Sequence, residues 1–160
     1  MQPEQQIKGS AQKVQEALSV LGISATVREM PASTRTAKDA ARAIGCTVGQ
    51  IAKSLIFRGA HTGKAILIIA SGTNKVNERA MADVVGEPIE RATPEFAREA
   101  TGYAIGGIPP VGHDQQLPVW MDTALLTFER IWAAAGTPEA VFEIRPDDLA
   151  RISKAKMIDL

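Results

Sequence analysis

The stretch Ile51-Ala-Lys-Ser-Leu-Ile-Phe57, followed by the run Ala65-Ile-Leu-Ile-Ile-Ala70, decides the fold of this 160-residue chain. Both segments are short, apolar and rich in branched side chains, which predicts two buried strands over 53–57 and 65–70. The intervening segment Arg58-Gly-Ala-His-Thr-Gly-Lys64 has the glycines of a turn. The sequence therefore predicts a central hairpin, around which the other elements are arranged.

Helices are predicted on both sides of this hairpin. Asn77 and Thr93 stand where a helix N-cap is expected, and Pro94 fits the first helical position. The predicted helices cover residues 7–21, 36–44, 77–85 and 93–102, with a last one beginning at Pro146.

Three more short strands are predicted, over 25–28, 119–122 and 141–144. The segment 124–135 is ambiguous, because its alanine and leucine content favours a helix whereas Ile131-Trp132 fits the start of a strand. Strands mixed with helices in no fixed alternation indicate an α+β fold rather than a doubly wound sheet. The length fits a single domain over residues 1–160.

The composition excludes several function classes. The net charge is zero, which argues against a strongly basic nucleic-acid binder. The single cysteine, Cys46, allows neither an internal disulfide nor a cysteine metal site. The N-terminus lacks a signal-peptide pattern, and no apolar run reaches membrane-spanning length, so we expect a cytoplasmic protein with no membrane partner.

The charges are unevenly distributed along the chain. Residues 1–80 hold eleven Lys and Arg against five Asp and Glu, whereas residues 81–160 hold seven against thirteen. Such an asymmetry is typical of a surface that faces a polyanion, and it is equally compatible with opposite charges that interleave on the folded surface.

Lys53 is a lone amine in an apolar strand. Strand alternation places Ile51, Lys53, Leu55 and Phe57 on one face, so the amine needs a polar partner or water. A lysine of a ligand site and a lysine that reaches solvent from a strand end both satisfy this pattern.

The loop Thr101-Gly-Tyr-Ala-Ile-Gly-Gly-Ile-Pro-Pro-Val-Gly112 is the second candidate. Gly106 and Gly107 allow close approach of a ligand to the backbone, and the two prolines restrict the loop. Exposed N–H groups in such a turn bind anions or oxyanions, although an ordinary connector has the same composition. His113 follows this loop directly and lies within reach of the same site.

Together, the two segments resemble the YbaK/prolyl-tRNA-deacylase family, free-standing relatives of the editing domain of bacterial prolyl-tRNA synthetases. The resemblance runs from about residue 25 to residue 159 and is carried by Ala52-Lys-Ser-Leu55, by the Gly-x-x-x-Pro pattern of Gly106 to Pro110, and by Asp122. It implies a mixed or antiparallel, barrel-like sheet with surrounding helices.

The resemblance also implies an activity, hydrolysis of the ester that links a wrong amino acid to the 3′ end of a tRNA. Lys53 matches the essential lysine and Gly106 opens the loop that holds the terminal adenosine and the aminoacyl group, so both are predicted to be catalytic. The predicted substrate-binding residues are Ser54, Gly107, Pro110, His113 and Asp122.

The partners that follow are the aminoacylated 3′ end of a tRNA and, as an open alternative, an aminoacyl-tRNA synthetase. No metal or organic cofactor is implied. The basic side chains Arg35, Lys38, Arg42, Lys75 and Arg79 are either a solvated rim or contacts to tRNA phosphates. The segment 30–36 matches no single subfamily, which leaves the amino-acid preference open.

Two other function classes compete with this one. A non-catalytic binding module for nucleic acid or a synthetase is compatible with the same fold, since fold does not settle function. A small-molecule esterase is disfavoured, because the sequence shows no Ser/His/Asp or Cys/His arrangement.

Overall fold

The computed structural model describes residues 9–160, so the predicted helix start at Ile7 lies outside the described residues. The helices are α1 (Ser10–Val20), α2 (Ala37–Ile44), α3 (Glu78–Val85), α4 (Pro94–Thr101) and α5 (Pro146–Ser153), with the 3-10 helices η2 (Val48–Gln50) and η3 (Thr123–Thr127). The predicted caps are confirmed: the side chain of Asn77 accepts a hydrogen bond from the N–H of Ala80, and that of Thr93 from Phe96.

The strands form one mixed sheet. They are β1 (Arg28–Glu29), β2 (Ile51–Gly59), β3 (Ala65–Ser71), β4 (Ile89–Arg91), β5 (Val119–Asp122), β6 (Ile131–Ala134), β7 (Ala140–Ile144) and β8 (Lys156–Ile158). Their order is β1-β7-β6-β2-β3-β5-β8, and β4 adds to β2. The pairs β2–β6, β3–β5 and β5–β8 are parallel, and the others are antiparallel. The predicted α+β class with a mixed sheet and surrounding helices is confirmed.

The central hairpin is also confirmed. β2 and β3 pair antiparallel over seven residues, with Lys53 opposite Ala70 and Phe57 opposite Ile66. β2 is the strand that joins the most neighbours, because β3, β4 and β6 all pair with it. The predicted hairpin is thus the centre of the sheet, although β2 begins two residues earlier and ends two residues later than expected.

Some predicted elements were wrong. The strand expected over 25–28 is reduced to Arg28–Glu29, because only these residues pair with β7. The segment 124–135 divides into η3 and β6, so neither a continuous helix nor a strand alone describes it. The short strands β4 and β8 were missed, since charged residues occupy two of the three positions in β4 and two of the three in β8 are exposed, which hides any apolar alternation.

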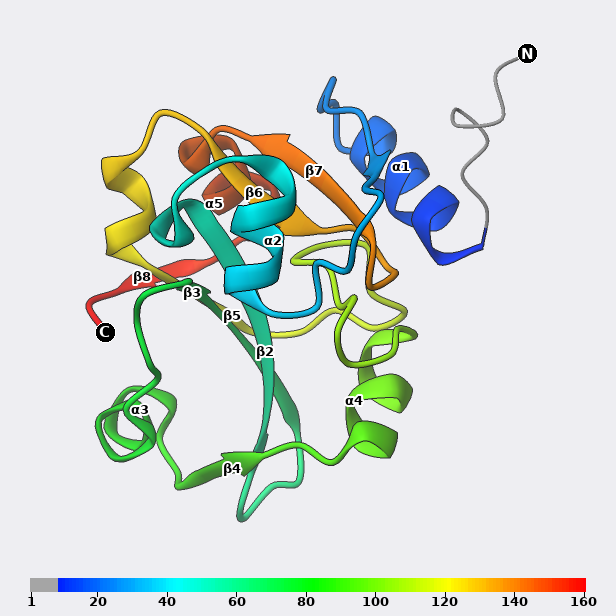
Figure 1. Ribbon diagram of the computed structural model, residues 1–160. Helices are drawn as coiled ribbons and strands as arrows, with labels where there is room; N and C mark the ends of the chain where they lie inside the picture. The colour runs from blue at the N-terminus through cyan, green and yellow to red at the C-terminus, as the bar shows by residue number, and fades with distance from the viewer. Residues whose placement is uncertain (1–8) are drawn as a thin grey trace.

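The helices surround the sheet on several sides. In Figure 1, α2 lies across the upper half of β2, and α3 and α4 stand on either side of its lower half, connected by β4. The main core cluster joins the inner face of α1 to strands and loops distant in sequence, including Ile56 of β2, Met121 of β5 and Phe142 of β7. Helix α1 contributes Ala11, Val14 and Leu18, all without exposed surface.

Leu18→Ala tests whether α1 is an integral part of this core. Leu18 is fully buried, so we expect the free energy of unfolding to fall by about 2–5 kcal/mol. The matched control is Val20→Ala in the same helix, where the side chain is 87% exposed and the change should be about 0.5 kcal/mol or less. Equal denaturation midpoints for the two variants in urea would contradict the packing described here.

Candidate functional site

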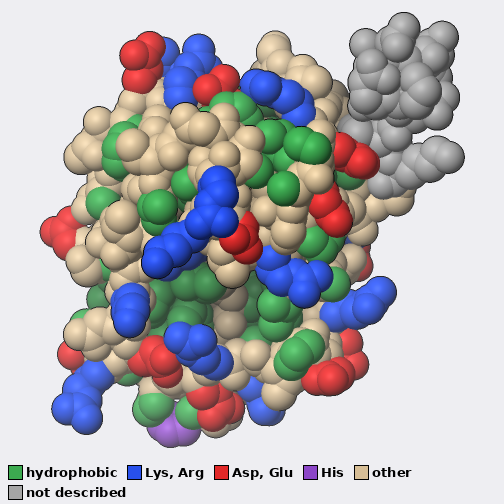
Figure 2. All heavy atoms as spheres, in the orientation of Figure 1, with side chains coloured by type: hydrophobic (Ala, Val, Ile, Leu, Met, Phe, Trp, Pro, Cys, Tyr) green, Lys and Arg blue, Asp and Glu red, His purple; other side chains and the backbone are tan. Residues whose placement is uncertain are grey.

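A large cavity opens beside the central strand. Its volume is about 1110 Å³, and its wall includes the whole segment Ile51–Phe57 of β2. Other wall residues come from the segment 34–38, α2, the turn after β3, the end of β4, β6 and the loop, where Ile105, Gly106 and Ile108 take part. Figure 2 shows a hollow on this face, with hydrophobic side chains at its floor and Lys and Arg side chains around it.

The cavity lies where one edge of β2 has no neighbouring strand. β6 pairs with β2 only at Ile51 and Ala52, and β4 pairs with it only from Phe57 onward. The opposite edge of β2 is fully paired with β3. The sheet therefore contains a gap at its centre, and both faces of β2 border the cavity there.

Lys53 lies in this gap and is held by a backbone acceptor. Its Nζ donates a hydrogen bond of 2.7 Å to the carbonyl oxygen of Asn74, in the turn after β3. Burial lowers the pKa of the Lys53 ammonium, and the Asp122 carboxylate opposes this effect by raising that pKa. Lys75 and Arg91 add a further lowering of the Lys53 pKa, because like charges disfavour the protonated form.

Asp122 fixes, by hydrogen bonds, the turn whose backbone carbonyl binds Lys53. Its Oδ2 accepts hydrogen bonds from Asn74 Nδ2 at 2.8 Å and from the N–H of Ser71 at 3.0 Å. Its Oδ1 accepts from the N–H of Ala124 at 2.9 Å, and the residue is only 1% exposed. Both carboxylate oxygens are thus occupied within the protein, so Asp122 acts on the cavity through Asn74 and through its charge.

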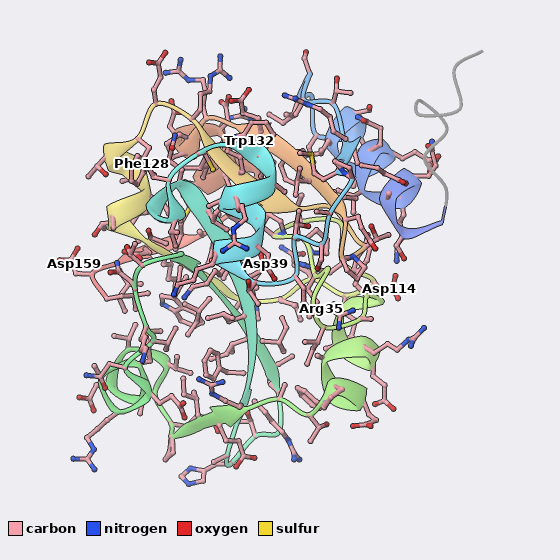
Figure 3. All side chains as sticks on the ribbon, viewed as in Figure 1. Arg35, Asp39, Asp114, Phe128, Trp132 and Asp159 are labelled. Atoms are coloured by element: carbon pink, nitrogen blue, oxygen red, sulfur yellow. The ribbon has the colours of Figure 1, made fainter. Side chains whose placement is uncertain are left out.

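The glycine-rich loop enters the cavity at Gly106. This residue has φ +100°, in the region that favours glycine, and a Cβ at that position would lie 2.9 Å from Nε of Arg35. Figure 3 shows Arg35 between α2 and the loop that follows α4. Thr34 is buried and donates to the carbonyl of Pro138 from both N and Oγ1, while Thr36 caps α2, so the backbone that carries Arg35 is fixed on both sides.

The other predicted residues of the loop region, Gly107, Pro110 and His113, lie outside the cavity wall. A Cβ on Gly107 would lie 2.7 Å from backbone atoms of Thr137, and Pro110 is buried. His113 Nε2 donates to the carbonyl of Pro109 at 2.7 Å, and burial lowers the pKa of the His113 imidazole. Its ring packs edge-on against Tyr103, where burial raises the pKa of the phenol to about 12.

The structure thus divides the predicted site residues into two groups. Lys53, Ser54 and Gly106 line the cavity. Gly107, Pro110, His113 and Asp122 are not part of its wall among the described residues. Asp122 supports Lys53 through Asn74, and His113 binds the carbonyl of Pro109 in the loop. Direct substrate contact by this second group stays a prediction that the geometry does not favour.

Sequence reasoning missed Arg91 and the turn carbonyl of Asn74. Arg91 lies in the acidic half of the chain, where the charge count gave no signal for it. The cations of the cavity wall are Arg35, Lys38, Lys53, Lys75 and Arg91, and no Asp or Glu of the described residues belongs to that wall. Arg42 and Arg79, which were considered with this rim, are not part of it.

Two further features bear on the possible partners. Within residues 9–160, no three His, Cys, Asp or Glu side chains are grouped so that they could bind a metal ion. In the same part of the chain, no helix has the length and apolar character needed to cross a membrane.

Comparison with known proteins now identifies the family, because the aminoacyl-tRNA editing domain matches residues 31–152. The chain belongs to the aminoacyl-tRNA editing domain family. This match spans the cavity wall from Arg35 to Val141, including Lys53 and Gly106. The resemblance drawn from the sequence motifs is therefore confirmed.

Relatives within the editing-domain family cover most of the chain. The uncharacterised protein YwhH of Bacillus subtilis is 33% identical over 131 residues, which cover 82% of this chain and 83% of YwhH. The proposed Cys-tRNA(Pro)/Cys-tRNA(Cys) deacylase EbsC of Enterococcus faecalis is 23% identical, over 78% of this chain and 76% of EbsC. The proline–tRNA ligase of Bacillus licheniformis is 26% identical, over 74% of this chain but only 20% of the ligase.

Solved structures support the same family. A crystal structure of a proposed trans-editing enzyme for prolyl-tRNA synthetase has a TM-score of 0.91 and 47% identity, covering 97% of this chain and 98% of the other. The hypothetical protein APE2540 has a TM-score of 0.85 and 28% identity, covering 92% and 97% of the two chains. The comparisons of sequence and the comparisons of structure thus indicate the same editing-domain family.

Asp122→Asn tests the electrostatic link to Lys53. The substitution removes the negative charge that raises the pKa of Lys53, so we expect this pKa to fall further below the ordinary value of lysine. The measurement is an NMR titration of the Lys53 side chain with labelled lysine. Asp114→Asn, an exposed carboxylate paired with Lys13, is the matched control and should leave the titration of Lys53 unchanged. Identical titration curves in both variants would refute the link.

Proposed function

We propose that this protein is a trans-editing hydrolase that deacylates mischarged aminoacyl-tRNA, with a small amino acid on tRNA-Pro or a similarly mischarged tRNA as its substrate. The observation that carries the proposal is the positive charge of the cavity wall. Its wall has five Lys and Arg and no Asp or Glu among the described residues, in a chain whose net charge is zero. Such a concentration of cations favours a polyanionic ligand.

The cations lie on opposite sides of the cavity. Arg35 precedes α2 and Lys38 lies in its first turn, whereas Lys75 follows β3 and Arg91 ends β4. Lys53 lies between them on β2. This arrangement suits a ligand whose phosphates cross the mouth of the cavity while its reactive end reaches the centre. The 3′ end of a tRNA has that form, because the ester is attached directly to the phosphate-bearing chain.

The floor favours a small uncharged acyl group. The remaining wall is mostly aliphatic and aromatic, and side chains of this kind come from β2, α2 and β6, such as Ile51, Ala40 and Trp132. A cationic side chain on the substrate would meet the five positive charges of the wall, and an anionic one would lose hydration against the apolar floor. The name of EbsC, a proposed deacylase of cysteine-charged tRNAs, supports a small amino acid.

The reaction needs no protein nucleophile. A water oxygen attacks the ester carbonyl carbon, the bond from that carbon to the ribose oxygen breaks, and the ribose oxygen takes a proton as the amino acid leaves. Lys53 acts as a fixed cation that orients the terminal phosphate or the carbonyl, because its Nζ is held by the Asn74 carbonyl. The backbone at Gly106, with no side chain in the way, approaches the substrate closely.

Lys53→Ala tests the catalytic assignment. We expect at least about a hundredfold loss of deacylation, in the range found when one electrostatic group is removed from an active site. Circular dichroism should show a folded protein, because only one hydrogen bond of the lysine is lost. The matched control is Lys156→Ala on β8, an exposed lysine remote from the cavity wall. If the alanine variant at 53 binds tRNA but neither it nor the wild type releases amino acid, the protein is a binding module rather than an enzyme.

Salt dependence tests the role of the cationic wall. Arg35→Ala removes one phosphate contact, so the slope of log(kcat/KM) against log[salt] should become shallower by about 0.7, the value for one contact to a single strand. Arg151→Ala on α5, whose side chain pairs with Asp148, is the control and should keep the slope of the wild type. An aminoacyl-adenosine ester should show little salt dependence with any of these proteins. Equal slopes on both substrates would favour a small-ester hydrolase instead.

A further inference from the structure

One residue at the gap in the sheet has no strand neighbour on one side of β2. In an antiparallel strand, successive residues direct their N–H and C=O groups alternately to the two neighbouring strands. In the β2–β3 hairpin, Gly59 donates to Lys64, on the β3 side. Ile56 accepts from the N–H of Ala92, and Ala60 donates to Pro88, both on the opposite side. Even-numbered residues of β2 therefore point away from β3, and Ser54 is one of them.

Ser54 lies between the part of β2 that pairs with β6 and the part that contacts β4. The parallel pairing with β6 ends at Ala52, and the contact on the β4 side begins with Ile56. On the β3 side Ser54 lies opposite Ile69, and on the other side no strand pairing of the described residues includes it, so its N–H and C=O face the gap. Its Oγ is buried without a partner. Unpaired backbone groups away from bulk water are costly, so they indicate a position that a ligand completes.

An aminoacyl group has the chemistry to complete it. In the closely spaced type of antiparallel pair, one residue donates its N–H to the C=O opposite and accepts from the N–H opposite. An amino acid esterified to ribose carries one amine and one carbonyl on the same α-carbon. These two groups correspond to the N–H and the C=O of one residue in such a pair. The aminoacyl group therefore matches a single free strand residue such as Ser54.

The charge of the cavity favours a neutral acceptor for the substrate amine. The α-ammonium group of the substrate is positive, and the wall offers it five cations and, among the described residues, no carboxylate. The carbonyl of Ser54 is a neutral acceptor at the centre of this wall, between the two groups of cations. Hydrogen bonds from a charged donor are stronger than neutral ones, so this contact contributes both affinity and orientation.

We propose that Ser54 binds the aminoacyl group as a one-residue β-bridge, in which its C=O accepts from the α-ammonium and its N–H donates to the ester carbonyl oxygen. This inference rests on the proposed deacylase function and specifies how the acyl end is recognised. The N–H of Ser54 then stabilises the oxygen that becomes negative when water attacks the carbonyl carbon. The bridge also selects esters with a free α-amino group over other esters of tRNA.

The first experiment changes the substrate and keeps the wild-type protein. Alanyl-tRNA is compared with lactyl-tRNA, in which a hydroxyl replaces the α-ammonium on the same carbon skeleton. Each kcat/KM is divided by the uncatalysed hydrolysis rate of that ester, because the ammonium itself activates the ester. We expect the normalised value for lactyl-tRNA to be about tenfold lower, because a neutral hydroxyl donor replaces a charged one.

The second experiment changes the backbone of the protein. Ser54→Pro removes the N–H, and since that N–H has no strand partner, proline should be tolerated there as it is on edge strands. Ser54→Ala removes only the hydroxyl, so the comparison of the two variants isolates the N–H. We expect kcat/KM of the proline variant to lie at least about tenfold below that of the alanine variant. Leu55→Pro removes an N–H that faces β3 and should unfold the protein, which checks the register.

The outcomes separate the inference from the proposed function. If the wild type cleaves neither ester, the proposed function fails. If it cleaves alanyl-tRNA and lactyl-tRNA equally after normalisation, the bridge is wrong while the deacylase function stands. If Ser54→Pro does not fold, an amide-to-ester replacement at residue 54 removes the same donor without changing φ, and kcat/KM equal to that of the wild type would again overturn the bridge.

Discussion

The buried carboxylate of Asp122 is the interaction on which the site depends. It accepts hydrogen bonds from the end of β3 and the turn after it, and from the first residues of η3, so it joins the segment 71–74 to the junction of β5 and η3 about fifty residues further along the chain. A carboxylate that is 1% exposed is tolerated because these N–H donors replace its water. The turn that Asp122 fixes presents the Asn74 carbonyl to Lys53, so a buried structural charge determines the position of the lysine that lines the cavity.

The second constraint is the interrupted edge of β2. A sheet normally pairs or covers its edges, since free N–H and C=O groups invite association with other chains. Here β6 and β4 cover the two ends of the edge, and the loop 105–108 and the segment 34–38 enclose the space between them. The enclosed edge excludes another protein strand but admits a small group. The same interruption lets side chains from both faces of β2 border one cavity, which is how Lys53 and Ser54 line it together.

The sequence predicted the centre of this arrangement better than its periphery. The two apolar runs, the caps at Asn77 and Thr93, and the strand Val119–Asp122 follow from local preferences, and all are present. The strands β4 and β8 exist only because tertiary pairing overrides weak local preference, so their own residues carry little signal. In the site, the isolated amine of Lys53 and the glycine pair at Gly106 were candidates that the residues alone left open, and the family resemblance chose between the alternatives; both line the cavity. The Asn74 carbonyl was not a candidate, because every residue has a carbonyl and only the fold determines which one faces a lysine.

The neutral chain and the cationic cavity are compatible because the fold separates the charges. Several acidic side chains pair with cations outside the cavity, as Asp114 does with Lys13 and Asp148 with Arg151. Of the wall cations, Arg91 pairs with Glu78, whereas Arg35 and Lys38 have no carboxylate partner among the described residues. A local field of one sign then persists at the cavity without a net charge that would bind nucleic acid everywhere on the surface. In the function proposed for this protein, affinity for the phosphates of a tRNA end is thus confined to one entrance, and the discrimination between acyl groups is left to the apolar floor and the free backbone of β2.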